Sequence, residues 1–180
     1  MSRSTSANVQ SLLSSVKQHK KFKQLAAYSI ACVTKAITPP AQGWRENVKE
    51  VVEGGGIHAI TEVLKQHPTD SDILAAATSS LSMLATTSEA AQAVVDSGGL
   101  DSVLESTTRS ELDTESAHHV AKLLEKVADK APTTFAGSRG PDAVAAIMER
   151  HAESRLVLAS CTRALEKASR TKEGAELLAS

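Results

Sequence analysis

An internal repeat of about 42 residues constrains the fold of this 180-residue chain more than any other feature. Each unit is marked by glycine in front of an apolar residue or a proline. The repeat-defining glycines are Gly55, Gly56, Gly98, Gly99 and Gly140. Successive sets are 43 and 41 residues apart, and the stretch 171–178 matches 87–94 at twice the period. Such a period is typical of stacked helical repeats, in which each unit buries its apolar face on its neighbour.

Each period contains the signals of three helices. The first, at 87–96, is short, begins with Thr and Glu, and is broken by glycines that tolerate a positive φ. The second follows the glycines and places apolar residues three and four positions apart. The third helices are the longest, and the same spacing predicts them at 73–85, 116–128 and 156–168. Their expected N-caps are Asp70 or Ser71 and Asp113 or Thr114.

The composition favours helices over sheets. Aromatic residues make up only 2% of the chain, whereas the strands of a β-sandwich are rich in aromatic and β-branched side chains. No apolar run reaches the roughly 20 residues that cross a bilayer. Cys32 and Cys161 are 129 residues apart and neither has a CxxC partner. We therefore expect an all-α protein without a membrane span, a disulfide framework or a cysteine zinc site.

Residues 44–85 and the unit that follows them resemble armadillo repeats. The sequence TSEAAQAVVDSGGLDSVLES, followed by a polar loop and a helix ending VAKLLEKVADKA, is similar to the short first helix, glycine bend, second helix and long third helix of that family. The resemblance covers about residues 44–180. It implies a right-handed α-solenoid of about three three-helix repeats, the last of them incomplete. HEAT repeats, which have two helices and usually lack the glycine bend, are the second choice.

The two ends of the chain are expected to differ from the repeats. Residues 1–8 are polar and are predicted to be a disordered tail. Residues 9–43 are predicted to be a basic helical segment, a degenerate or capping repeat, which a proline pair separates from the repeats. Leu177 and Leu178 lie in a repeat that stops before its next glycine bend. Because a solenoid unit normally packs on the next one, further repeats or a protein docked end-on are expected there.

Armadillo proteins are usually protein-recognition scaffolds, and the resemblance implies that the third helices line a concave groove. In the nuclear-import branch of the family, this groove carries a ladder of Trp and Asn residues. The corresponding positions in this chain are Ser79, Lys122 and Arg163 for Trp, and Met83, Lys126 and Lys167 for Asn. Because the ladder is absent, basic localisation peptides are not the expected ligands.

The groove is instead expected to carry cations. Its candidate residues are His118, Lys122, Lys126, Arg163 and Lys167. The lysines of the first helix, and the Arg and Lys of the second, are spaced i, i+4 and so share a helix face. An extended acidic peptide fits such a surface. The competing interpretation is an ordinary solvated face, because Glu125 and Glu166 lie beside the cations.

Charge is unevenly distributed along the chain. Seven of the 20 basic residues, and none of the 21 acidic ones, precede Glu46. Helices are predicted at 9–23 and 25–37, and the candidate docking lysines there are Lys17, Lys20, Lys21 and Lys23. These lysines are expected to dock on an acidic protein surface such as that of tubulin. Nucleic acid is a weaker alternative, because few aromatic residues are available to stack on bases and the rest of the chain is acidic.

No motif of catalysis or metal binding was found: GxSxG, P-loop, HExxH and EF-hand patterns are absent. His118 and His119 are adjacent and diverge by about 100° on a helix, which does not suit a metal site. Catalytic residues, cofactors and metals are therefore not expected. We predict a non-catalytic scaffold or adaptor in a larger assembly, cytoplasmic and of the cytoskeletal, ciliary or flagellar kind that the resemblance suggests. The alternatives are a transport or cargo adaptor and a nucleic-acid-associated protein, and the acid-free start leaves organelle import open.

Overall fold

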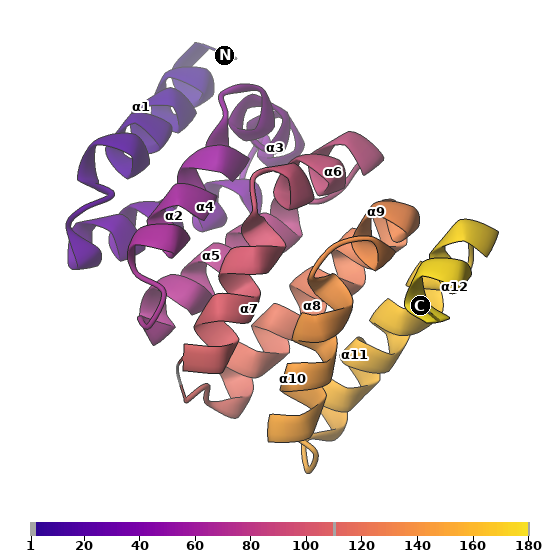
Figure 1. Cartoon of the computed structure of the whole chain (residues 1–180). Helices are drawn as coiled ribbons and strands as arrows, with labels where there is room; N and C mark the ends of the chain where they lie inside the picture. Colours follow the sequence, from indigo (N-terminus) through magenta and orange to yellow (C-terminus); the bar gives the residue numbers. More distant parts are fainter. Residues whose placement is uncertain (1–2, 110, 180) are drawn as a thin grey trace.

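The structure, a computed structural model, describes residues 3–109 and 111–179, and every regular element in these ranges is a helix (Figure 1). The helices stack in three rows, so that elements one repeat apart in the sequence lie side by side. The prediction of an all-α, repeat-like fold is therefore confirmed.

The rows differ in helix length. The first row holds the short helices α3 (Trp44–Glu53), α6 (Ser88–Asp96), α9 (Pro132–Ala136) and α12 (Lys172–Ala179). The second row holds α1 (Arg3–His19), α4 (Gly56–Gln66), α7 (Gly99–Arg109) and α10 (Gly140–Arg150). The third row holds α2 (Lys23–Ile37), α5 (Ser71–Leu84), α8 (Thr114–Lys130) and α11 (Arg155–Ala168). Successive helices are in contact along the second and third rows.

The third row forms the centre of the core. On α8, the inward stripe Val120, Leu123, Leu124 and Val127 has no exposed surface, as its i, i+3, i+4, i+7 spacing predicts. The helices expected at 73–85, 116–128 and 156–168 agree with α5, α8 and α11 to within two residues at each end. The apolar spacing was sufficient here because each of these helices has neighbours that cover its stripe.

The expected N-caps are also in place. Asp70 accepts a hydrogen bond from the Ile73 N–H at 2.9 Å, and Asp113 accepts one from the Ser116 N–H at 2.7 Å. Thr87 caps α6 in the same way. Each such bond satisfies a backbone donor that a helix start leaves without a partner, and is worth about 1 kcal/mol. The caps therefore fix where the polar loops end and the stacked helices begin.

Glycines shape the first two bends for two separate reasons. Gly55 and Gly98 have φ angles of +75° and +76°, a region in which a side chain is strained. Gly56 and Gly99 begin α4 and α7, and a Cβ on Gly99 would lie 2.7 Å from the carbonyl oxygen of Val94. The second glycine of each pair therefore permits the close approach between the first-row and second-row helices.

The third bend is built differently. Gly140 begins α10, but the residue before it is Arg139, with a φ of −78°. The short helix α9 ends at Ala136, and its Phe135 ring is fully buried. A Cβ on Gly140 would lie 2.5 Å from this ring. At this bend glycine is needed only to make room for Phe135, and the left-handed residue of the other bends is missing.

The N-terminal segment departs from the sequence expectations. Helix α1 begins at Arg3, so residues 3–8 are not a disordered tail; Met1 and Ser2 lie outside the described residues. Once Val9 and Leu13 pack in the core, extending the helix by a further turn costs little compared with nucleating one. The pair Pro39-Pro40 also fails to separate this segment, because α1 contacts α3 and α4 while α2 packs on α5.

Apolar side chains are exposed at both ends of the stack. Leu156 on α11 is 67% exposed and Leu177 on α12 is 40% exposed, whereas Leu178 is half-buried. At the other end Phe22 and Tyr28 are 63% and 71% exposed. The end-on neighbour expected beside α12 stays a prediction. Within the described ranges, no helix combines the length and the apolar character needed to cross a bilayer.

We predict that Gly98→Ala lowers the free energy of unfolding by about 1–2 kcal/mol, because an L side chain is strained in the left-handed region. Gly137→Ala is the matched control: its φ is −83° and its new Cβ would meet nothing closer than 3.5 Å. Urea denaturation followed by circular dichroism measures both. Equal losses in the two variants would show that the left-handed bend contributes nothing.

Candidate interaction surface

The five candidate groove residues come from two neighbouring helices of the third row. His118, Lys122 and Lys126 lie on α8, and Arg163 and Lys167 lie on α11, which packs against it. The side chains of Lys122 and Lys126 are exposed, and neither forms a hydrogen bond or ion pair with another described residue. The structure therefore brings all five residues to one region. The two helices differ in whether their cations are paired with carboxylates.

The cations of α11 are already neutralised by α8. Glu125 Oε1 accepts hydrogen bonds from Arg163 Nε at 2.9 Å and from Lys167 Nζ at 3.1 Å. The Lys167 ammonium is also 3.4 Å from the Asp129 carboxylate. Of the two glutamates considered from the sequence, Glu125 thus compensates the candidate cations, whereas Glu166 pairs with Arg170. The cations that α11 was expected to offer to a ligand are held in a bridge between helices.

This bridge also sets the acidity of Glu125. Burial alone would raise the pKa of its carboxyl group, but the hydrogen bonds from Arg163 and Lys167 outweigh burial and the net pKa is lowered. Asp129 follows the same pattern, with burial opposed by Lys130 and Lys167, and its pKa is lowered as well. Both carboxylates therefore remain charged at neutral pH and hold the α8–α11 contact.

The pKa of His118 is lowered by its surroundings on α8. Its pKa is lowered by partial burial first, and then by the charges of Lys122, His119 and Arg163. Its Nδ1 is buried and has no hydrogen-bond partner among the described residues. A lowered pKa means that the imidazole is neutral at pH 7. His118 therefore adds a polar group to this surface but no charge at that pH.

The four candidate docking lysines do not form one uniform patch. Lys17 Nζ donates to the Gly54 carbonyl at 2.9 Å, and Lys23 Nζ lies 2.5 Å from the Asp70 carboxylate that caps α5. Lys20 is half-buried, and its carbonyl oxygen is 2.8 Å from a ring nitrogen of His67. Lys21 is fully at the surface. The segment is packed structure in which two of the four lysines stabilise the first repeat.

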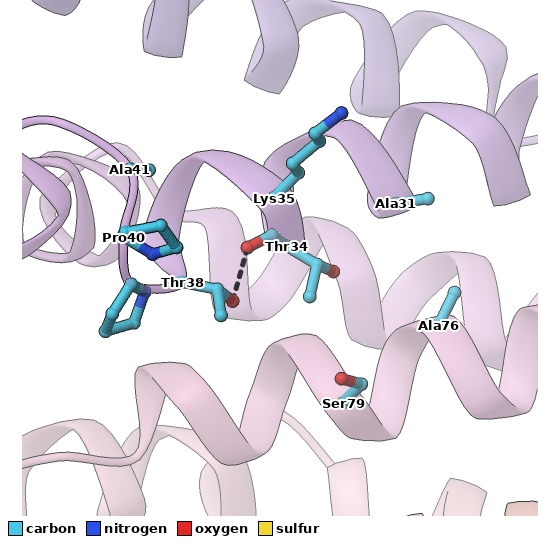
Figure 2. A pocket seen from close by; sticks show the side chains of 9 residues that line it. Ala31, Thr34, Lys35, Thr38, Pro40, Ala41, Ala76 and Ser79 are labelled. Carbon is cyan, nitrogen blue, oxygen red and sulfur yellow. Dashed lines mark hydrogen bonds between the residues drawn. The ribbon is translucent and has the colours of Figure 1, made fainter.

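The structure adds a feature that the sequence did not reveal. An opening of about 590 Å³ lies between α2 and α5, lined by both helices and the loop that follows α2 (Figure 2). Lys35 rises from its rim on the α2 side, and Ser79 lies across from it on α5. This opening depends on the register between the two helices, which composition and periodicity do not specify.

Comparison with protein-family models, curated proteins and solved structures finds no match to this chain. Among the described residues, no three His, Cys, Asp or Glu side chains are grouped so that they could hold a metal ion. Free Cys161 is buried between helices, and burial raises the pKa of its thiol to about 11. The exposed lysines of α8 and the opening beside Lys35 are thus the features from which function is inferred.

We predict that Glu125→Gln destabilises the protein by about 1–2 kcal/mol at pH 7, since it removes a charge from a half-buried hydrogen-bonded bridge. The lowered pKa of Glu125 means that its stabilisation is complete above its usual pKa of 4.5 and is lost as pH falls through the lower value in the folded state. The variant should therefore lose less stability than the parent between pH 5 and pH 3.

The control for this prediction is Glu166→Gln, because Glu166 is 62% exposed and forms its ion pair with the surface residue Arg170. Its unfolding free energy should change little at either pH. Urea denaturation at pH 7 and in the acid range measures all three proteins. A Glu125 variant that behaves like the Glu166 variant would contradict a structural role for the α8–α11 bridge.

A second prediction concerns His118. Lys122→Gln should raise the pKa of His118, because the Lys122 charge is the largest electrostatic cause that lowers it. Lys126→Gln removes the same charge one turn further along α8 and should have the smaller effect. Imidazole shifts followed by NMR during a pH titration measure both. Equal shifts would mean that the potential at His118 is spread over the surface and does not come from Lys122.

Proposed function

We propose that this protein is a non-catalytic protein-binding scaffold, an armadillo-type α-solenoid whose third-row helices bind an extended acidic segment of a partner. The observation that carries the proposal is the pair Lys122 and Lys126. Both are exposed on one face of α8, and no described residue pairs with either. Two like charges one helical turn apart repel each other, and a carboxylate from a ligand relieves that repulsion.

The armadillo assignment is supported by the arrangement within each unit. A short helix, a glycine bend, a second helix and a longer third helix occur twice in full, at α3–α5 and α6–α8. The third helices then stack in a row of their own. A solenoid presents such a row as one continuous surface, which suits an extended ligand better than a compact one.

The α8–α11 bridge supports a protein ligand over nucleic acid. Because Glu125 and Asp129 pair with Arg163 and Lys167, the candidate cations left for a ligand here are Lys122 and Lys126, and two charges are few for a phosphate backbone. The exposed aromatic rings available for stacking on bases are Tyr28 on α2 and Phe22 just before it, and neither is on α8. A peptide can place its carboxylates selectively at Lys122 and Lys126, whereas a polyphosphate chain carries a charge at every nucleotide.

Acidic surfaces of cytoskeletal or ciliary assemblies, tubulin among them, are the class of partner that we propose. The exposed Lys21 and the half-buried Lys20 add cations in the turn between α1 and α2. Charge complementarity of this kind accelerates encounter and makes binding sensitive to salt. A cargo or transport adaptor would use the same surface, and the identity of the bound protein would distinguish the two roles.

The proposal is tested by reversing both charges in Lys122→Glu/Lys126→Glu. A fluorescent ten-residue peptide of alternating Glu and Gly is the probe, with tubulin as the second ligand. We expect the variant to bind about tenfold more weakly at low salt and to lose most of its salt dependence, because two charge contacts become repulsive. Fluorescence anisotropy at several salt concentrations measures both effects.

The matched control is Lys49→Glu/Lys172→Glu, which changes the net charge equally at exposed positions of α3 and α12. It should retain the affinity of the parent apart from a small general loss. If the two double variants bind equally, the surface of α8 has no specific role, and the lysines are an ordinary solvated face.

A further inference from the structure

The opening between α2 and α5 can be compared with the contact between α8 and α11 in the same row. Superposing the buried positions of the helices aligns Val33 of α2 with Leu81 of α5 and Leu124 of α8. In this register Thr34 takes the place in its helix that Glu125 takes in α8. The same register matches the α5 residues Ser80 and Leu84 to the α11 residues Arg163 and Lys167.

The comparison explains why one gap is closed and the other is open. Between α8 and α11, Glu125 reaches across to Arg163 and Lys167. Between α2 and α5, the corresponding positions hold Thr34 opposite Ser80 and Leu84, so a hydroxyl pair takes the place of the ion bridge. Among the described residues Lys35 has no hydrogen bond or ion pair. A space of about 590 Å³ remains beside the hydroxyl pair.

The walls of this space suit an apolar side chain. Ala31, Pro40 and Ala76 present only methyl and methylene groups to it. The threonine hydroxyls that line it already have partners. Thr38 donates to the Thr34 carbonyl at 2.7 Å (Figure 2), and the Thr34 hydroxyl pairs with that of Ser80. Because these groups are satisfied, a polar occupant would find few partners, whereas an apolar one loses its contact with water.

We infer that the α2–α5 opening is the anchor site of the partner: it takes an aliphatic side chain of an extended peptide, with a neighbouring carboxylate on Lys35. This inference rests on the proposed function and specifies its ligand. Apolar walls with a single unpaired cation at the rim match an apolar side chain next to an acidic one.

The distance between neighbouring helices of the third row sets how many residues separate the aliphatic side chain of the peptide from its carboxylates. Packed helices are about 8–10 Å apart, so the α8 lysines lie about 12–15 Å from the middle of the α2–α5 gap. An extended chain covers about 3.3 Å per residue. The carboxylates for Lys122 and Lys126 are therefore expected about four to five residues from the aliphatic anchor.

The probe for the test is a labelled ten-residue peptide with Asp-Leu near one end, Asp-Glu five residues after the Leu, and Gly or Ser elsewhere. The comparison peptide carries Ala in place of Leu. We expect the parent protein to bind the Leu peptide about tenfold more tightly than the Ala peptide, because only Leu fills the opening. Fluorescence anisotropy measures both affinities.

Three variants locate this preference. Ala31→Phe fills the opening and should remove the advantage of the Leu peptide, whereas Ala145→Phe adds the same ring at an exposed position of α10 and should preserve it. Lys35→Gln leaves the opening intact and should weaken both peptides by a similar factor. Thermal melts should show all three variants folded, since each site is at the surface.

The outcomes separate the two proposals. If the parent binds Leu and Ala peptides equally, yet both depend on Lys122 and Lys126, the anchor site is refuted and the acidic-peptide surface stands. A Leu preference that survives Ala31→Phe also refutes the anchor site, because the side chain must then bind elsewhere. If neither peptide binds the parent protein, the proposed function fails and the anchor site fails with it.

Discussion

Close packing between the long helices of the third row is the constraint on which the rest of the structure depends. Small side chains make it possible: Ala77 on α5, Ala121 on α8 and Ala164 on α11 have no exposed surface. Buried hydroxyls in these helices avoid the usual penalty because they bond to their own backbone, as Thr78 does with the Leu74 carbonyl at 2.7 Å. The low aromatic content of the chain is thus a requirement of the stack.

The long helices and their starts could be predicted from the sequence because the signals are local. Periodic apolar residues and the caps Asp70 and Asp113 act within one helix, and the bends at Gly55 and Gly98 involve adjacent residues. The bridge from Glu125 to Arg163 joins residues 38 positions apart, so it depends on how two helices are aligned. Charge patterning alone therefore gave one cationic surface where the structure has a compensated half and a free half.

The start of α1 could not be predicted for a different reason. Residues 3–8 have no apolar periodicity of their own, and their helical state follows from the turns after them, where Val9 and Leu13 are buried. Propensity is a weak guide when an adjoining helix is already anchored. Likewise, the docking role expected of Lys17 and Lys23 overlooked acceptors supplied by other units, the Gly54 carbonyl and the Asp70 carboxylate.

Among the described helices, extensive contacts join elements of the same or adjoining units. Such an arrangement is mechanically compliant. A small rotation at each boundary adds to the rotation at the next, so the whole stack can bend. The boundary between α8 and α11 is held by two ion pairs of Glu125, whereas the one between α2 and α5 has a pair of hydroxyls and an ion pair of Lys23 with the Asp70 cap. Bending is therefore expected to be smallest at the α8–α11 boundary, so that the stack is stiffer at that end.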